Sequence, residues 1–186
     1  MQGHPVSYSQ STLTELMIPA YANFGGKIHG GTLLSLMDKV AYVCASKHAG
    51  NYCVTVSVDN VNFLAPAEVG DLVSMIASVN YVGSSSLVVG IRVVAENVQT
   101  GRSRHTNTSY FTMVARGPDG AKAEVPPLIL EHPEEIRRFA SALRRRRLRL
   151  FATERMEEYK RDFVVDDEVR AFLARERCEI RWEDGA

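Results

Sequence analysis

The fold is decided by residues 22–42, which read ANFGGKIHGGTLLSLMDKVAY. Four glycines and an asparagine precede an apolar run, and one acidic residue, Asp38, lies in the middle of that run. The run continues to Gly50 with almost no polar face, which predicts a helix over residues 31–50 that is buried nearly all round and ends at a glycine. An aspartate in such a helix is costly to bury ionised, so it is either a core residue with hydrogen-bond partners or a catalytic base.

After this helix, apolar and polar side chains alternate, which is typical of strands. In the segment CVTVSVDNVNFL the alternation holds through Val54, Val56 and Val58 and then slips, which predicts a bulge or bend near Asp59 and Asn60. Further strand-like runs cover residues 13–18, 71–82, 86–98 and 103–116. Because the turn-type segments GSSS and QTGR separate the last three runs, these runs predict an antiparallel meander.

One long buried helix and about five antiparallel strands can cover each other's apolar surfaces if the sheet curls around the helix. The expected architecture is therefore an α+β hot-dog fold, with an antiparallel sheet wrapped around one central helix. A single sheet of this kind leaves one side of the helix and an edge strand uncovered. Since the sequence contains no internal repeat, a second copy of the chain is expected to cover them.

Charge is unevenly distributed along a chain whose formal net charge is zero. Half of the residues from 131 to 186 are charged, against 24% for the whole chain. We therefore predict a hot-dog domain over residues 1–130 and a charged, mainly helical C-terminal extension over residues 131–186. Residues 133–163 read as one charged helix, and a second short helix is expected between 160 and 186.

The run RRRR at residues 144–147 is a candidate nucleic-acid contact, but acidic residues balance it and no aromatic pattern accompanies it. A solvated or oligomer-facing helix is the better interpretation, and no nucleic-acid partner is expected. No stretch reaches the roughly 18 uncharged apolar residues that cross a bilayer, and the first residues lack a secretory pattern. The prediction is a cytoplasmic protein with no membrane partner.

The three cysteines, Cys44, Cys53 and Cys178, have no metal-ligand spacing, so reduced and mostly buried thiols are expected, with no metal site. The histidines His4, His48 and His132 are expected at the surface, because no partner is evident beside them.

The glycines at the start of the helix point to a binding role. Backbone N–H groups in a first helical turn are unpaired and lie at the positive end of the helix dipole. With Gly30 and Gly31 there, a ligand can approach the main chain, and the amides could form an oxyanion hole. The alternative is that both glycines serve only a tight turn or helix packing.

Spacing limits how these groups can cooperate. Eight residues separate Gly30 from Asp38, which is about 12 Å along a helix at 1.5 Å per residue. That is too far for both groups to contact one carbonyl. Two antiparallel helices side by side would bring the first turn of one against the middle of the other. The spacing therefore predicts two equivalent sites, each shared across a dimer.

The segments NFGGKIHGGTLLSLMDKVAYVCASKH and VTVSVDNVNFLAPAEVGD, in this order, resemble the acyl-CoA thioesterases of the hot-dog superfamily, in particular the branch of cytosolic acyl-CoA hydrolases and YciA-like bacterial enzymes. The resemblance covers roughly residues 10–145. It implies hydrolysis of acyl-CoA to a free fatty or other carboxylic acid and CoA. No cofactor is implied, since the CoA is part of the substrate.

The resemblance also implies roles for single residues. Asp38 falls on the catalytic carboxylate, which acts as a general base on water or as a nucleophile that forms an anhydride. Asn23 falls on an amide that positions the water or the thioester carbonyl, although it could also be a simple turn residue. The helix-start amide that binds the carbonyl oxygen falls on Gly30 or Gly31.

Members of this family often form hexamers built as trimers of dimers and bind the nucleotide of CoA between dimers, so an oligomer of this kind is expected. Each residue proposed below to bind the substrate could equally be a solvated residue at a hairpin end or a core-packing residue. The candidate substrate-binding residues are His29, Tyr42, Ser57, Asp59, Ser84, Ser85, Ser86, Arg102, Arg104 and His105. Of these, the three serines and Arg102, Arg104 and His105 are expected to contact the CoA phosphates from two neighbouring turns.

Two other functions compete with hydrolysis. A hot-dog enoyl-CoA hydratase or dehydratase would use a loop histidine for proton transfer, and His29 lies just before the helix. Against this, such enzymes usually have an Asp or Glu in the role that Asn23 takes here, or a Glu further along the helix. A non-catalytic acyl-CoA-binding sensor would need a DNA-reading module, and the segment before residue 13 is too short for one.

Overall fold

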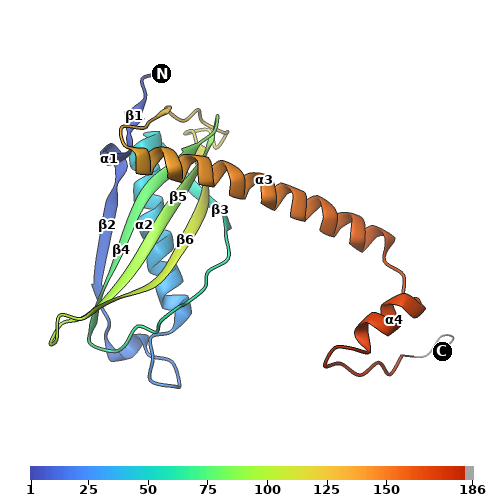
Figure 1. The fold of residues 1–186 in the computed structure, drawn as a ribbon. Helices are drawn as coiled ribbons and strands as arrows, with labels where there is room; N and C mark the ends of the chain where they lie inside the picture. Colours follow the sequence, from blue (N-terminus) through green and yellow to red (C-terminus); the bar gives the residue numbers. More distant parts are fainter. Residues whose placement is uncertain (183–186) are drawn as a thin grey trace. The chain divides into compact units, whose positions relative to one another are not determined.

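The computed structural model describes residues 1–182 (Figure 1). The last four residues of the predicted extension over residues 131–186 lie outside the described residues. In chain order, the elements are β1 (His4–Pro5), α1 (Val6–Ser9), β2 (Ser11–Leu16), the short 3-10 helix η1 (Pro19–Tyr21), α2 (Gly30–Ala49), β3 (Tyr52–Val58), β4 (Asp71–Val82), β5 (Ser86–Asn97), β6 (Ser103–Arg116), β7 (Leu128–Ile129), α3 (Pro133–Asp162) and α4 (Asp167–Leu173).

Five antiparallel strands form one sheet in the order β2-β4-β5-β6-β3, and this sheet curls around α2 (Figure 1). The predicted hot-dog fold is therefore confirmed, as is the meander of β4, β5 and β6. The strand bounds 71–82 and 103–116 are confirmed, and β2 begins two residues earlier than predicted. Since β3 pairs with β6 at the end of the sheet, β2 and β3 are its two edge strands.

The bulge lies earlier in β3 than predicted. The pairing of β3 with β6 shifts register between Thr55 and Ser57, so Val56 is the extra residue. The prediction of a bulge near Asp59 and Asn60 was wrong, because the alternation of three valines continues through the inserted residue and hides it. Val56 is 54% exposed, so the valine face is not the core face of this strand.

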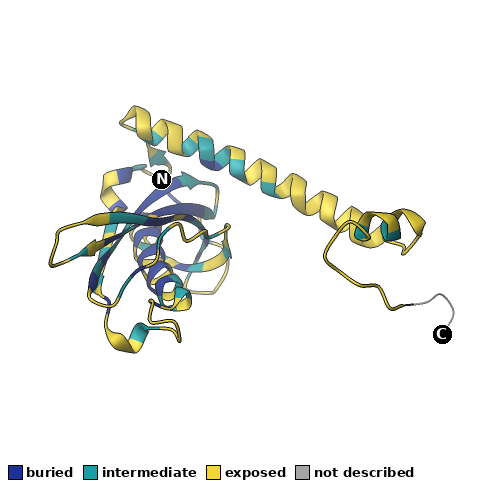
Figure 2. Cartoon of the chain, turned by 60° about the horizontal axis from the view of Figure 1, so that its bottom comes forward, coloured by how far each residue is buried: buried dark blue, intermediate teal, exposed yellow. Residues whose placement is uncertain are grey.

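The core lies between α2 and the inner face of the sheet, and Figure 2 shows its buried residues there. On α2 the buried positions recur every three to four residues and so lie along one face. They are Leu33, Leu36, Met37, Val40, Ala41, Cys44, Ala45, His48 and Ala49. The predicted burial of the helix nearly all round is wrong for the single chain, because the sheet covers only one side. An exposed stripe includes Ser35, Asp38, Lys39, Tyr42 and Val43.

The C-terminal end of α2 is tied to the N-terminal arm. Gly50, with φ 64°, closes the helix as predicted, and its N–H donates to the carbonyl of Ser46 at 2.9 Å. His48 is fully buried, and its Nε2 lies 3.1 Å from the carbonyl oxygen of Pro126. The His4 ring contacts the carbonyl of His48 at 3.1 Å. The predicted surface position of His48 was wrong, because β1 and β7 pair over the end of the helix.

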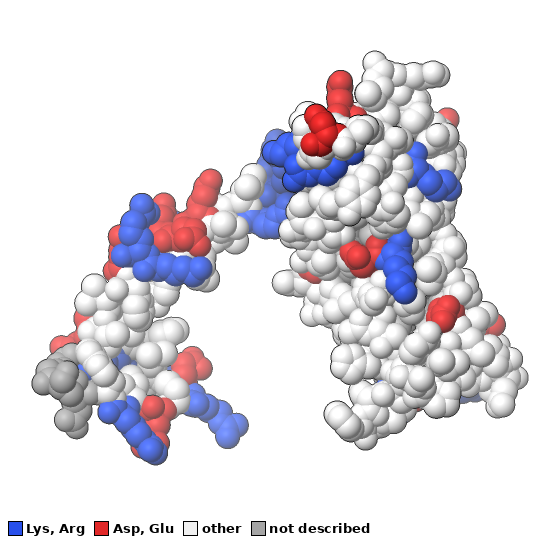
Figure 3. Space-filling view, turned by 180° about the vertical axis from the view of Figure 1, so that it is seen from behind, with Lys and Arg blue, Asp and Glu red and all other residues white. Residues whose placement is uncertain are grey.

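The charged helix predicted over residues 133–163 is present as α3, and α4 is the predicted second short helix. Residues 1–143 and the described residues from 144 onward form two compact units, and each is described by itself. The proposed boundary between residues 130 and 131 stays a prediction. In the second unit basic and acidic side chains are interspersed, as Figure 3 shows. No helix in residues 1–182 is both long and apolar enough to cross a membrane.

Candidate active site

The Asp38 carboxylate is the centre of the candidate site. It lies on the exposed stripe of α2, although the apolar residues around it in the sequence predicted a buried position. The hydroxyl of Thr55, on β3, donates to Oδ1 of Asp38 at 2.6 Å. The same hydroxyl lies 3.0 Å from the sulfur of Met113. No residue among 1–182 hydrogen-bonds to Oδ2 of Asp38, so one carboxylate oxygen is held by the protein and the other remains available for chemistry.

Thr55 is a site residue that the sequence analysis missed. It stands between Val54 and Val56 in the alternating segment, on the face opposite the valines. A hydroxyl residue on that face, in the strand that directly follows the helix, is the signal that could have found it. The bulge at Val56 directly after it also marks this point of the strand.

Asp38 lies where two open grooves meet, and most of the residues that line them are apolar. The first has a volume of about 480 Å³ and runs past Tyr42, whose ring centroid is 5.9 Å from that of Tyr52. The second has a volume of about 490 Å³ and contains Asp59, one of the predicted substrate-binding residues. The remaining lining residues are Lys39, Val43, Cys53, Val54, Thr55 and Met113 in the first groove and Leu34, Val58, Asn60, Val61 and Phe111 in the second.

Asn23 lies in an exposed loop between η1 and α2. Its side-chain Oδ1 accepts hydrogen bonds from the N–H groups of Gly25 at 2.9 Å and Lys27 at 3.1 Å. Its carbonyl accepts from the N–H of Gly26, which has a φ of 75°. These bonds form a local turn of the kind that Asn favours. Because Oδ1 is occupied, the group that Asn23 can offer to a ligand is its Nδ2 donor.

The two glycines at the start of α2 differ in their hydrogen bonds. The N–H of Gly31 donates to Nδ1 of His29 at 2.9 Å, so His29 caps the helix. Within residues 1–182 the N–H of Gly30 has no hydrogen-bond acceptor. Since Nδ1 of His29 accepts, the neutral ring carries its proton on Nε2. A free helix-start amide is therefore present at Gly30.

In the single chain, these two groups of residues are separate. α2 is continuous from Gly30 to Ala49, so Gly30 and Asp38 are about 12 Å apart along the helix axis. Asn23 and His29 line another groove, of about 730 Å³, together with Ala22, Phe24 and Gly25. The candidate site therefore has two parts, Asn23 with Gly30 and Asp38 with Thr55.

The two turns predicted to bind CoA phosphates are not neighbours within one chain. Ser84, Ser85 and Ser86 belong to the turn before β5, whereas Arg102, Arg104 and His105 follow the turn after it. The 12 residues of β5 separate these turns by about 40 Å, at opposite ends of the sheet (Figure 1). The expectation of neighbouring turns was wrong, because the two hairpin turns of a meander lie at opposite ends of its middle strand.

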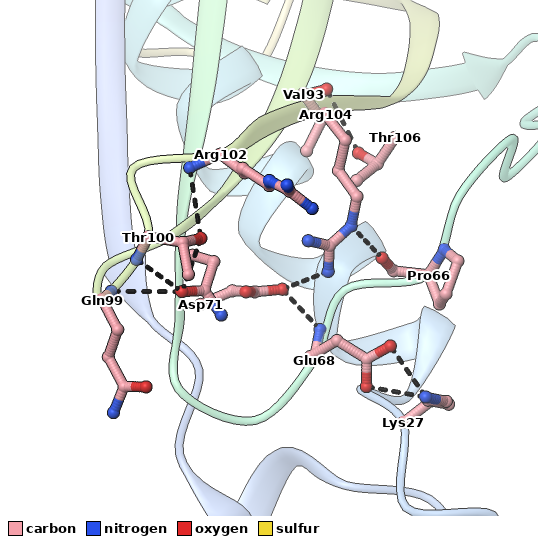
Figure 4. Close-up of polar contacts among 11 residues, drawn as sticks. Lys27, Pro66, Glu68, Asp71, Val93, Gln99, Thr100, Arg102, Arg104 and Thr106 are labelled. Carbon is pink, nitrogen blue, oxygen red and sulfur yellow. Dashed lines mark hydrogen bonds and ion pairs between the residues drawn. The ribbon is translucent and has the colours of Figure 1, made fainter.

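Arg104 is occupied by the protein itself (Figure 4). Its Nη2 forms an ion pair with Oδ2 of Asp71, and its Nε donates to the carbonyl of Pro66 at 2.9 Å. Asp71 is only 1% exposed. By contrast, the Arg102 side chain is exposed, and His105 contacts the hydroxyl of Thr108 at 2.9 Å.

The chain matches known proteins over most of its length. The family model described as the thioesterase superfamily matches residues 25–102. Protein VdlD of Helicobacter pylori is 44% identical over 137 residues, which make up 74% of this chain and 78% of VdlD. A hexameric acyl-CoA thioesterase, solved in its apo form, is 35% identical with a TM-score of 0.80, over 82% of this chain and 98% of that chain.

The acyl-CoA hydrolase of Staphylococcus aureus, solved in complex with butyryl coenzyme A, coenzyme A and coenzyme A disulfide, is 30% identical with a TM-score of 0.75. The match covers 86% of this chain and 99% of that chain. Structures of the same hydrolase with one Asn, one Asp or one Thr replaced by Ala also match. In that protein the replaced Asn precedes the Asp by 15 positions, and the Asp precedes the Thr by 17.

Proposed function

The chain belongs to the thioesterase superfamily, and we propose that it is an acyl-CoA thioesterase that splits acyl-CoA into a free carboxylic acid and CoA. The observation that carries this proposal is the Asp38 carboxylate, held by the Thr55 hydroxyl at 2.6 Å, while its second oxygen has no hydrogen-bond partner in the described part of the chain. An oriented carboxylate in a mostly apolar groove is suited to activate water or to attack a thioester.

Asp38 has two routes to the products. As a general base, its free oxygen takes a proton from water while the water oxygen bonds to the thioester carbon. The carbon–sulfur bond then breaks, and the proton passes to the CoA sulfur. As a nucleophile, the same oxygen bonds to the carbon, the carbon–sulfur bond breaks and CoA leaves as the thiolate. Water then hydrolyses the anhydride, which regenerates the Asp38 carboxylate and supplies the proton that the thiolate takes up. Both routes use the oxygen of Asp38 that Thr55 does not bind.

The carbonyl oxygen of the thioester gains negative charge in either route and needs hydrogen-bond donors. The N–H of Gly30, which has no acceptor among the residues that the structure describes, lies at the positive end of the α2 dipole. Nδ2 of Asn23 is the second donor, because the loop occupies its Oδ1. We assign the carbonyl contact to Gly30 and the positioning of carbonyl or water to Asn23. Gly31 serves the helix cap instead.

Asn23 and Asp38 must come from two chains if they act on one carbonyl. The exposed stripe of α2 and the edge strand β3 are apolar at Tyr42, Val43, Val56 and Val58, each of which is 41–54% exposed. A second copy packed antiparallel along this stripe would cover them and would place Gly30 of one chain opposite Asp38 of the other. The hexameric relative supports assembly of such dimers into a larger oligomer.

The spacing of the residues supports these roles. Asn23, Asp38 and Thr55 are separated by 15 and 17 positions, the same intervals as the Asn, Asp and Thr replaced in the S. aureus hydrolase. For the CoA portion, Ser57 and Asp59 near the Asp38 grooves and the exposed Arg102 are the better placed of the predicted contacts. The cytoplasmic location expected from the sequence stays a prediction.

A thiol-release assay with acyl-CoAs of increasing chain length tests this function, with Asp38→Asn as the control variant. Hydrolysis predicts free CoA thiol from the wild type and a loss of about 1,000-fold in kcat for the variant, within the range of general acid–base catalysis. Loss of enoyl absorbance from an enoyl-CoA without thiol release would favour a hydratase that uses His29. Tight binding without turnover would favour a sensor.

A further inference from the structure

The segment from Pro66 to Asp71, which leads into β4, is anchored to the sheet by one arginine. Arg104 on β6 donates from Nε to the carbonyl of Pro66 at 2.9 Å and forms an ion pair with Asp71 through Nη2. Oδ2 of Asp71 also accepts the N–H of Glu68 at 2.7 Å. Figure 4 shows the contacts from Arg104 Nη2 and from the N–H of Glu68 meeting at the Asp71 carboxylate, and the separate bond from Arg104 to Pro66. Arg104 therefore fixes both ends of this segment.

Burial makes this anchor rigid. The Asp71 side chain is 1% exposed, and within the described residues its Oδ1 has no hydrogen-bond partner. A carboxylate that has lost its water depends on the cation beside it, so Asp71 holds Arg104 in one place. The backbone of Asp71 adds a second attachment, since its carbonyl accepts the N–H of Met17 at 2.8 Å.

The loop that carries Asn23 is attached to this segment. The N–H of Ile28 donates to the carbonyl of Ala67 at 3.0 Å. Next to it, Nζ of Lys27 lies 2.7 and 2.8 Å from the two carboxylate oxygens of Glu68. Backbone and side chain thus join the loop to the anchored segment at adjacent positions.

Lys27 is in turn bonded directly to Asn23. The N–H of Asn23 donates to the carbonyl of Lys27 at 2.7 Å, and the N–H of Lys27 donates to Oδ1 of Asn23 at 3.1 Å. A displacement of Lys27 therefore turns the Asn23 amide. Hydrogen bonds and ion pairs form an unbroken path from Arg104 through Asp71, Glu68 and Lys27 to Asn23.

We propose that the Lys27–Glu68 ion pair, held in place by Asp71 and Arg104, positions the Asn23 amide for the reaction. This inference rests on the proposed thioesterase function. Lys27, Glu68, Asp71 and Arg104 are positioning residues in this proposal, since they act through the Asn23 amide. The Lys27–Glu68 pair is partly exposed, 51% and 38%, and such pairs add little to stability. Its effect is on geometry, to which catalysis is far more sensitive than folding.

Charge reversal tests the pair in the intact protein. Lys27→Glu and Glu68→Lys should each lower kcat for acyl-CoA hydrolysis by about tenfold, with KM changed less than about twofold, because a small displacement of a catalytic group is costly. The double variant, Lys27→Glu with Glu68→Lys, restores the pair and should return kcat to within about threefold of the wild type. Tm should change by less than about 3 °C in all three, since the pair is exposed.

A second measurement separates positioning from a general weakening of the fold. In an Asn23→Ala background the positioned amide is absent, so Lys27→Glu should lower the remaining kcat by less than about twofold. Arg155→Glu, which breaks an exposed ion pair with Glu158 in the second unit, is the matched control and should leave kcat unchanged.

The outcomes are distinct. If the wild type releases no thiol from any acyl-CoA, the proposed function fails and this inference fails with it. If the wild type is active but Lys27→Glu leaves kcat unchanged, only the positioning role is overturned. It is also overturned if the double variant does not recover, or if Lys27→Glu costs as much in the Asn23→Ala background as alone.

Discussion

The two parts of the candidate site are built in different ways. Asp38 lies in the middle of a continuous helix, and its carboxylate is held by a hydroxyl from the adjacent strand β3. Asn23 lies in a loop with a positive-φ glycine, and hydrogen bonds within the loop and an exposed ion pair hold it. One part takes its geometry from secondary structure, whereas the other depends on a chain of polar contacts.

This difference indicates where the site tolerates change. A helix and a strand packed on one core move together, so few substitutions outside the contact between Asp38 and Thr55 should displace the carboxylate. A loop held by polar contacts can shift locally without unfolding. We therefore expect substitutions distant from the reaction to affect Asn23 much more than Asp38.

The largest effect on stability is expected at Arg104, which anchors the segment to which the Asn23 loop is attached. Arg104→Ala leaves the buried carboxylate of Asp71 without its cation, which should lower the free energy of unfolding by about 3 kcal/mol. Urea denaturation followed by circular dichroism measures this change. Arg102→Ala removes a nearby exposed arginine and should change the free energy by less than about 0.5 kcal/mol. Equal effects of the two substitutions would show that the ion pair with Asp71 does not anchor the fold.

The Asn23 part can be tested with a nearly isosteric substitution. Asn23→Asp keeps an oxygen that can accept from Gly25 and Lys27, so the loop should stay in place. It removes the Nδ2 donor, and kcat should fall by about 100-fold, as for loss of an oxyanion-hole donor. Thiol-release kinetics measure this change. A kcat within a few-fold of the wild type would mean that Asn23 acts only through its turn.

The Asp38 part can be tested through its strand partner. Thr55→Ala removes the hydroxyl that holds Oδ1 of Asp38 and should lower kcat by about tenfold, as expected for losing a hydrogen bond to a charged group. Thr55→Ser keeps a hydroxyl at the same place and should retain kcat within about threefold. If Thr55→Ala were as active as the serine variant, this hydrogen bond would have no catalytic role.

The smallest effect is expected on the pH dependence of stability, at the opposite end of α2 and away from both parts of the site. Burial lowers the pKa of His48 below its usual 6.5, and the bond from its ring to the carbonyl of Pro126 opposes this only in part. Between the folded and unfolded pKa values the unfolded chain binds more protons, so the contribution of His48 to stability is full above about pH 6.5 and is lost as pH falls below that.

The free energy of unfolding, measured from pH 7.5 down to pH 5.5, should therefore decrease. The contribution of His48 to this decrease is at most about 1.4 kcal/mol per pH unit. His48→Gln should flatten that part of the profile. A wild-type profile that does not decline as pH falls below 6.5, or one that His48→Gln leaves unchanged, would contradict a buried neutral histidine.

The features that were predicted correctly are those encoded within a single segment of the sequence. The strands at 71–82 and 103–116 were predictable, and the helix predicted over residues 31–50 is present as Gly30–Ala49, because alternation, turn residues and a closing glycine are encoded within each segment. The hot-dog fold followed from their order and from the apolar surface of the helix.

The interactions that sequence reasoning missed involve partners far apart in the chain. Thr55 pairs with Asp38, Arg104 with Asp71, and His48 with His4 and Pro126. No local pattern specifies which of these side chains meet, because pairing depends on strand order and register. For the same reason, the alternation of the valines in β3 did not reveal the bulge or show which face of the strand is buried.

The central claim is that the two parts of the site meet across two chains. Asp38→Asn and Asn23→Asp proteins should each be nearly inactive, but a mixed dimer would contain one site with both native residues. After subunit exchange at a 1:1 ratio, thiol release should recover to about a quarter of the wild-type rate, since half of the dimers are mixed and each has one intact site of two. A mixture that shows no more than the summed activity of the two variants, although exchange is demonstrated, would contradict the shared site.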